Sequence, residues 1–163
     1  MVLGLSIGAF TLLHVAITLV AIGSGLIAVG GMFAANRLPG TTALFLFTTV
    51  LTSVTGFLFP IHGFTPALGV GIVSCVILAV ALYAYYAKGL TGAWARIYVV
   101  TAILSLYLNV FVLVIQSFIK VAALNALAPT QSNEPAFVTA QGLVLALFVL
   151  MGIIATVKFR PMR

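Results

Sequence analysis

Residues 93–124 read AWARIYVVTAILSLYLNVFVLVIQSFIKVAAL and carry only two charged side chains, Arg96 and Lys120. At 1.5 Å per residue, about 20 apolar residues cross the roughly 30 Å hydrocarbon core of a bilayer as an α-helix. The stretch contains no proline, the residue that most often ends a helix. It therefore predicts one continuous membrane-spanning helix.

Four further apolar stretches surround this one. All six prolines fall between the stretches, at their edges or after the last one, where helices are expected to end. The sequence therefore predicts an all-α fold: a single transmembrane domain over residues 1–163 that forms an integral membrane five-helix bundle. The expected spans cover residues 3–31, 41–59, 66–87, 93–124 and 136–159.

Composition supports a membrane protein over a soluble one. Hydrophobic residues make up 64% of the chain and charged residues only 5%, against about 25% charged residues in soluble domains. The net charge of +6 arises from side chains at the ends of apolar stretches, so the expected partner is the lipid bilayer and not nucleic acid. The single cysteine, Cys75, excludes an internal disulfide, and no Cys/His spacing indicates a metal site.

The basic residues give the bundle a direction. With five spans, one side of the membrane holds six of them, and the other side holds only Lys120. Because cytoplasmic loops are rich in Lys and Arg, we expect the N-terminus outside and the C-terminus in the cytoplasm. The six residues are Arg37, Lys88, Arg96, Lys158, Arg160 and Arg163.

Polar side chains form a stripe along the fourth span. Tyr98, Ser105, Asn109, Gln116 and Lys120 are spaced by 7, 4, 7 and 4 residues, which places them on one face of a helix. In hydrocarbon, such a face turns toward other helices or water. The fourth span is therefore expected to be central in the bundle or to line a cavity.

Other spans carry matching polar residues. Thr11, His14 and Thr18 share one face of the first span, and His14 lies about 16 Å along that expected helix. Together these positions predict an outer-half polar pocket formed by the first, second, fourth and fifth spans. The expected ligand-binding residues are His14, Thr11, Thr18, Thr52, Asn109, Gln116, Lys120 and Gln141, and His62 and Glu134 are expected at the pocket mouth.

A purely structural interpretation of the same residues stays open. Threonines in membrane helices commonly bond to their own backbone, and Asn or Gln often link helices. His14 would then be a neutral hydrogen-bonded bridge, and Lys120 would extend its ammonium to the lipid headgroups.

Several kinds of chemistry are disfavoured. The chain has no Asp, and its one Glu, Glu134, lies outside the spans. A membrane carboxylate relay and a carboxylate pair for acid–base hydrolysis are therefore unexpected. No glycine-rich phosphate loop follows a strand. We assign no catalytic residue, and the pattern leaves enzymatic activity open while favouring a non-enzyme.

Three functional hypotheses follow. The first is a membrane protein that binds or passes a small molecule, lipid or ion through the polar pocket, which implies transport or binding. The second is a membrane redox subunit that binds haem through a single histidine, or a quinone through His14 and Gln116. The third is a structural or assembly subunit of a larger membrane complex. The cofactor, if one exists, stays unassigned.

Small residues in the first span suggest close helix packing. Gly4 and Gly8 form a GxxxG pair, and Ala21 and Gly25 continue the small residues. Such notches let helix backbones approach closely. They predict either packing within the monomer or a homo-oligomer through the Gly4/Gly8 face.

One stretch carries a family resemblance. Leu106–Phe137 opens with LYLNVFVLVIQSFIK and closes with ALAPTQSNEPAF. It resembles a signature of uncharacterised small five-helix bacterial inner-membrane proteins. The resemblance implies a multi-pass protein of the bacterial inner (plasma) membrane, and no transferable activity. The tryptophan-rich sensory proteins, also of five spans, are set aside because this chain has only Trp94.

Overall fold

The computed structural model describes residues 1–60, 63, 66–130 and 133–160, and its regular elements are helices. Five of them are long and apolar enough to cross a membrane, which confirms the predicted all-α fold with five long helices. The elements are α1 (Ile7–Phe33), α2 (Pro39–Phe57), α3 (Pro66–Leu82) with its π-helical continuation η1 (Tyr83–Ala87), α4 (Trp94–Lys120), α5 (Ala122–Leu127) and α6 (Pro135–Lys158).

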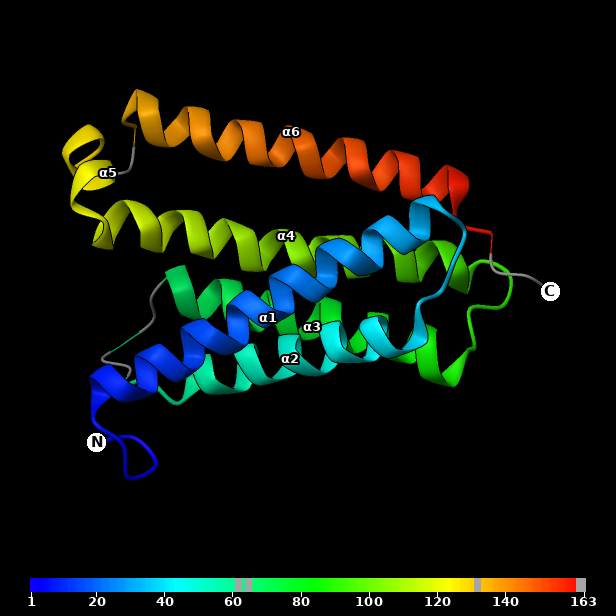
Figure 1. Ribbon diagram of the computed structural model, residues 1–163, viewed down its shortest axis with the longest axis horizontal. Coiled ribbons are helices and arrows are strands. Elements are labelled where there is room, and N and C mark those ends of the chain that lie inside the picture. The colour runs from blue at the N-terminus through cyan, green and yellow to red at the C-terminus, as the bar shows by residue number, and fades with distance from the viewer. Residues whose placement is uncertain (61–62, 64–65, 131–132, 161–163) are drawn as a thin grey trace.

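The helices lie along one long axis, and α4 occupies the middle (Figure 1). It contacts α1, α2, α3 and α6, as the polar stripe on this helix predicted. Helix α6 packs on the far side of α4 and touches α1, and most of its surface is exposed and apolar. In a bilayer that surface faces lipid, whose tails are as apolar as leucine.

The first helix begins later than expected. Leu3 and Gly4 adopt left-handed backbone angles, with φ of 51° and 80°. The helix starts only after Ser6, whose side chain accepts a hydrogen bond from the Ala9 amide at 3.2 Å, a typical N-cap. Gly4 and Gly8 therefore do not lie on one helix, and the predicted Gly4/Gly8 packing face is wrong in its geometry.

The fourth helix ends earlier than expected. Val121 adopts an extended conformation after Lys120, and the separate short helix α5 follows. The Asn125 side chain donates a hydrogen bond to the Phe118 carbonyl at 3.1 Å, so it satisfies one of the carbonyl groups that a helix end leaves unpaired. At this point a side-chain hydrogen bond replaces a backbone one, and the predicted span 93–124 is divided into α4 and α5.

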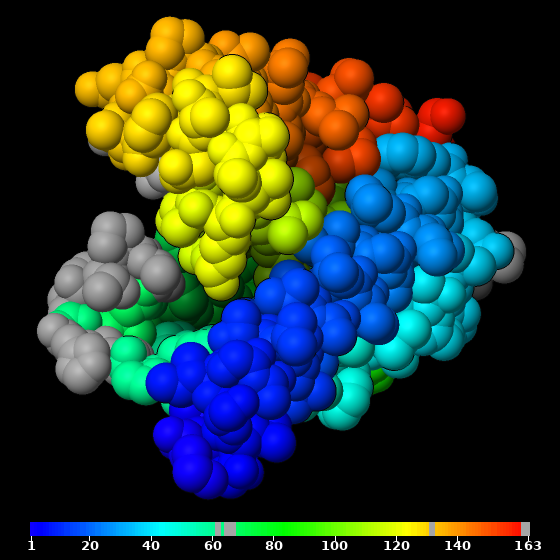
Figure 2. Space-filling view, turned by 60° about the vertical axis from the view of Figure 1, so that its left-hand side comes forward, coloured from blue at the N-terminus to red at the C-terminus, as the bar shows by residue number. Residues whose placement is uncertain are grey.

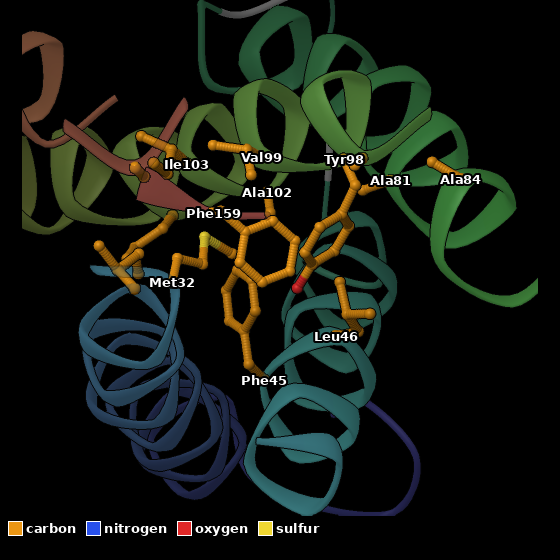
Figure 3. Packing of buried hydrophobic residues seen from close by; sticks show 14 of the residues in the cluster. Met32, Phe45, Leu46, Ala81, Ala84, Tyr98, Val99, Ala102, Ile103 and Phe159 are labelled. Carbon is orange, nitrogen blue, oxygen red and sulfur yellow. The ribbon is translucent and has the colours of Figure 1, made fainter. Parts of the chain in front are cut away.

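Large apolar side chains fill one half of the bundle, which we call the packed half. It lies where α1 and α3 end and where α2 and α4 begin (Figure 1). Figure 3 shows side chains from these helices and Phe159 converging there. Its buried residues include Val29, Met32, Phe45, Leu46, Ala81, Tyr98, Val99 and Leu106.

Gly25 marks the closest approach of α1 to its neighbours. A Cβ atom at this position would lie 2.7 Å from Leu106 Cδ1 and 2.9 Å from Phe45 Cδ2. Only glycine allows α1 to sit this close to both α2 and α4. The small residues of the first span therefore pack within the monomer at Gly25, and the packed half is closed at its boundary with the rest of the bundle.

Candidate functional site

The other half of the bundle contains a cavity of about 710 Å³ between α1, α2, α3 and α4, which we call the central cavity. Figure 2 brings this end of the molecule forward and shows a hollow between α1 and the end of α4. Its apolar lining includes Val15, Phe57, Leu68, Val70, Leu108 and Val112. Its polar lining consists of Thr11, His14, Thr18, Thr52, Ser53, Ser74, Asn109, Gln116, Ser117 and Lys120.

The structure brings most of the predicted ligand-binding residues to this cavity. Seven of the eight line it: Thr11, His14, Thr18, Thr52, Asn109, Gln116 and Lys120. The spacing on α1 and α4 thus identified side chains that share one space, and their role in binding stays a prediction.

Gln141 lies elsewhere. Its Nε2 donates a hydrogen bond to the Phe111 carbonyl on α4 at 3.2 Å, so it links α6 to α4. The expected fifth-span wall of the pocket is supplied instead by α3, because α6 packs on the outer side of α4.

The predicted mouth residues are not seen at the cavity. Glu134 stands before the first turn of α6 and accepts a hydrogen bond from Thr130 at 3.0 Å. It is absent from the cavity lining. His62 lies outside the described residues.

His14 connects α1 to α2. Its Nδ1 lies 2.7 Å from the Thr55 hydroxyl oxygen, and its ring meets Phe59 edge-on with 5.4 Å between centroids. Phe59 in turn packs edge-on against Phe10, at 4.9 Å. The bridge that sequence allowed for His14 is therefore present, and the same side chain also lines the central cavity.

Two of the three cavity threonines, Thr11 and Thr18, have little hydrogen-bonding capacity as donors. Thr11 bonds to the Ile7 carbonyl and Thr18 to the His14 carbonyl, both at 2.8 Å. Such bonds to the preceding turn consume the single hydroxyl proton. These side chains therefore offer oxygen lone pairs to whatever occupies the cavity.

Asn109 is the most deeply buried polar residue of the cavity on α4. It is only 8% exposed, and its amide nitrogen has no hydrogen-bond partner within the part of the chain that the structure describes. A buried polar group left unpaired costs about 1–3 kcal/mol. A water molecule or a ligand in the cavity would supply the missing hydrogen bond to this amide nitrogen.

Lys120 places a positive charge at the end of the cavity where α4 ends. It is the last residue of α4, is exposed, and lies near enough to His14 for the two to interact electrostatically. The only acid of the chain, Glu134, does not line the cavity. The lining therefore has a positive end without an acidic partner of its own.

Sequence reasoning did not identify the contribution of α3. Ser74 lines the cavity and is buried, and a Cβ on Gly71 would lie 3.1 Å from the Phe57 ring. The available signal was Ser74 itself, an isolated hydroxyl within an otherwise apolar stretch. A small residue such as Gly71 also lets α3 approach α2 closely enough to form a wall.

A second groove of about 460 Å³ lies between α4 and α6. Its lining is apolar apart from Thr156 and includes Ile103, Leu104, Tyr107, Phe148 and Gly152. The Thr156 hydroxyl already bonds to the Gly152 carbonyl at 2.7 Å. This groove matches lipid tails and gathers no group for chemistry.

Comparisons with protein-family models, with curated proteins and with solved structures gave no match to this chain. The central cavity is therefore the basis for a functional proposal.

Proposed function

We propose that this chain is a small multi-pass membrane protein that binds a small amphipathic molecule in the central cavity. The observation that carries the proposal is the convergence of polar side chains from four helices on one space of about 710 Å³. Ligand sites of drug-sized molecules commonly span about 300–1,000 Å³, with mostly apolar walls and a few polar groups. The unpartnered amide of Asn109 supports a ligand with its own hydrogen-bonding group.

The packed half supports binding over passage. Beyond Asn109, α4 continues into the buried side chains of Leu106, Ala102 and Tyr98. The close contact of Gly25 with Phe45 and Leu106 lies at the same boundary. The cavity therefore ends inside the bundle, as expected of a site that holds a molecule.

We further propose that the cavity opens toward the outside of the cell membrane. The α1–α2 connection, the η1–α4 connection and the end of α6 lie at the opposite end of the bundle (Figure 1). These segments carry Arg37, Lys88, Arg96, Lys158 and Arg160. The positive-inside rule assigns that end to the cytoplasm, which supports an outside N-terminus in a bacterial inner membrane.

Filling the cavity tests the proposal. Val112 lines the cavity on α4, whereas Ile119 on the same helix is exposed and does not. Native mass spectrometry of the detergent-solubilised wild type is expected to show a bound amphiphile in about equal ratio to protein. Val112→Trp should lose it and Ile119→Trp should keep it. Equal retention in both variants, or no adduct in the wild type even after incubation with membrane lipid extract, would contradict the proposal.

A second candidate is a membrane redox subunit that binds a quinone. His14 and Gln116, the pair that the sequence suggested for a quinone, line the same cavity, and a quinone is itself amphipathic. Solvent extraction of purified protein separates the two candidates, since a stoichiometric quinone would favour the redox role. An extract with another amphiphile and no quinone would favour the first.

A further inference from the structure

The hydrogen bonds around Thr55 determine which nitrogen of His14 carries the proton. Thr55 Oγ1 lies 2.7 Å from the Leu51 carbonyl oxygen and 2.7 Å from His14 Nδ1. A hydroxyl has one proton, and a carbonyl oxygen can only accept. If Thr55 donates to Leu51, both short contacts are hydrogen bonds only when His14 Nδ1 donates to Thr55.

The alternative arrangement is poorer. With the proton on Nε2, Thr55 would donate to Nδ1 and its oxygen would face the Leu51 oxygen at 2.7 Å without a proton between them. The Nε2–H would then need a partner of its own, and no hydrogen bond to Nε2 is present among the described residues. The neutral ring therefore carries its proton on Nδ1, which leaves Nε2 as an acceptor.

The central cavity thus has an imidazole acceptor in addition to the oxygen atoms of its threonines and Gln116, and it has donors on Asn109 and Lys120. His14 supplies the Nε2 lone pair, Asn109 an unpartnered N–H₂ group, and Lys120 an ammonium. Because Lys120 is the one charged side chain among the described residues of the lining, it matches a single negative charge. A phosphate, with about −1.5 to −2 charges, would ordinarily need more cationic partners.

We infer that the central cavity selects a hydroxylated monocarboxylate: an amphiphile whose carboxylate lies beside Lys120 and whose hydroxyl donates to His14 Nε2. This inference rests on the proposed function and names the ligand class for that site. His14 is seven residues inside α1 and Lys120 is the last residue of α4, and both helix ends lie at the same end of the bundle (Figure 1). The two groups are therefore separated by about 10 Å along the helix axes.

Three matched probes test the inference: ω-hydroxydecanoate, decanoate and the methyl ester of ω-hydroxydecanoate. Their Kd values are measured by native mass spectrometry on the full chain, as wild type, His14→Phe and Lys120→Gln. Each probe partitions differently into detergent. The readout is therefore the ratio of the Kd values of two probes for one form of the protein, compared with the same ratio for another form. This comparison removes the partitioning difference.

We expect the hydroxyl to improve binding in the wild type, and His14→Phe to remove about a tenfold preference for it. Lys120→Gln should remove the preference for the acid over its ester and leave the hydroxyl preference in place. Equal preference for the hydroxyl in wild type and His14→Phe overturns the inference and leaves the proposed function standing. Failure of all three probes to bind the wild type overturns the inference, whereas the proposed function falls only when the wild type also takes up no amphiphile from membrane lipid extract.

A spectroscopic measurement is independent of any ligand and of the fate of His14→Phe. The ¹⁵N shifts of the imidazole, recorded at alkaline pH in a His62→Gln background that leaves one histidine, distinguish the two tautomers. The inference expects the Nδ1–H form, and expects Thr55→Val to abolish it. Thr48→Val is the matched control, because Thr48 also bonds to its own helix but is not hydrogen-bonded to a histidine. An Nε2–H tautomer in the wild type overturns the inference.

Discussion

The packed half and the half that holds the central cavity share four helices, α1 to α4, yet one half is filled and the other is hollow. Helix α4 shows the contrast most directly: Tyr98 and Leu106 are fully buried among apolar side chains, whereas Gln116 and Lys120 line the cavity. On α2, Phe45 occupies the packed half, and Ser53 and Gly56 occupy the other.

Side-chain size explains the difference better than polarity does. The packed half also contains threonines, such as Thr42 and Thr49, whose hydroxyls bond to nearby backbone carbonyls at 2.8 Å. Several wall positions of the cavity carry small side chains in place of residues such as Phe45 and Tyr98, among them Ser53, Gly56, Gly71 and Ser74. Native interiors leave few voids larger than a water molecule, so small residues on neighbouring helices account for the cavity and agree with the proposed ligand site.

The largest expected effect comes from disturbing the closed boundary between the halves. Gly25→Leu should lower the free energy of unfolding by about 3 kcal/mol, since its side chain would clash with Leu106 and Phe45. Gly23→Leu is the control, because no atom lies within 4 Å of a Cβ at that position. Thermal unfolding in detergent measures both, and equal midpoints would show that the boundary is not tightly packed.

A smaller effect should come from making the cavity resemble the packed half. Asn109→Leu removes an unpartnered buried amide, so we expect the ligand-free protein to gain about 1–2 kcal/mol of stability while binding weakens. Ser105→Ala, one turn before Asn109 on α4 and outside the cavity lining, should also stabilise the chain, with binding unchanged. Unfolding midpoints and ligand occupancy are compared in the same samples. Lower stability of ligand-free Asn109→Leu would contradict an unpaired amide.

The smallest change in stability is expected from a residue that lies outside both halves. Gln141→Leu removes the hydrogen bond from α6 to the Phe111 carbonyl and also the buried Oε1 of Gln141, which has no partner among the described residues. The two effects oppose each other, so we expect a change in stability of less than about 1 kcal/mol. Ligand occupancy should stay at the wild-type level because Gln141 does not line the cavity. A loss of ligand occupancy comparable to that of Val112→Trp would show that α6 contributes to the binding site, contrary to a cavity lined by α1 to α4.

The sequence predicted the features that depend on a single helix. Apolar length identified five spans, and the spacing of Asn109, Gln116 and Lys120 identified one face of α4 that lines a cavity. The neighbours of each helix were harder to predict. An apolar helix such as α3 has little contrast between its faces, so nothing in its pattern shows that it, and not α6, lies beside α2.

Local capping explains the errors at helix ends. Hydrophobicity alone extends the first span to Leu3 and the fourth to Leu124. The actual ends depend on the hydrogen bonds of Ser6 and Asn125, and such bonds compete with helix propagation. The Gly4/Gly8 face failed for this reason, because a motif defined by spacing needs a helix on which that spacing applies.

The peripheral position of α6 has a consequence for the order in which the protein is made. The helices that line the central cavity among the described residues are α1 to α4, and α6 follows them in the sequence. As the ribosome delivers residues from the N-terminus onward, these four helices are made before the 24 residues of α6. The contacts of Phe148, Ala155 and Phe159 therefore join the packed half only after the four helices around the cavity have been synthesised.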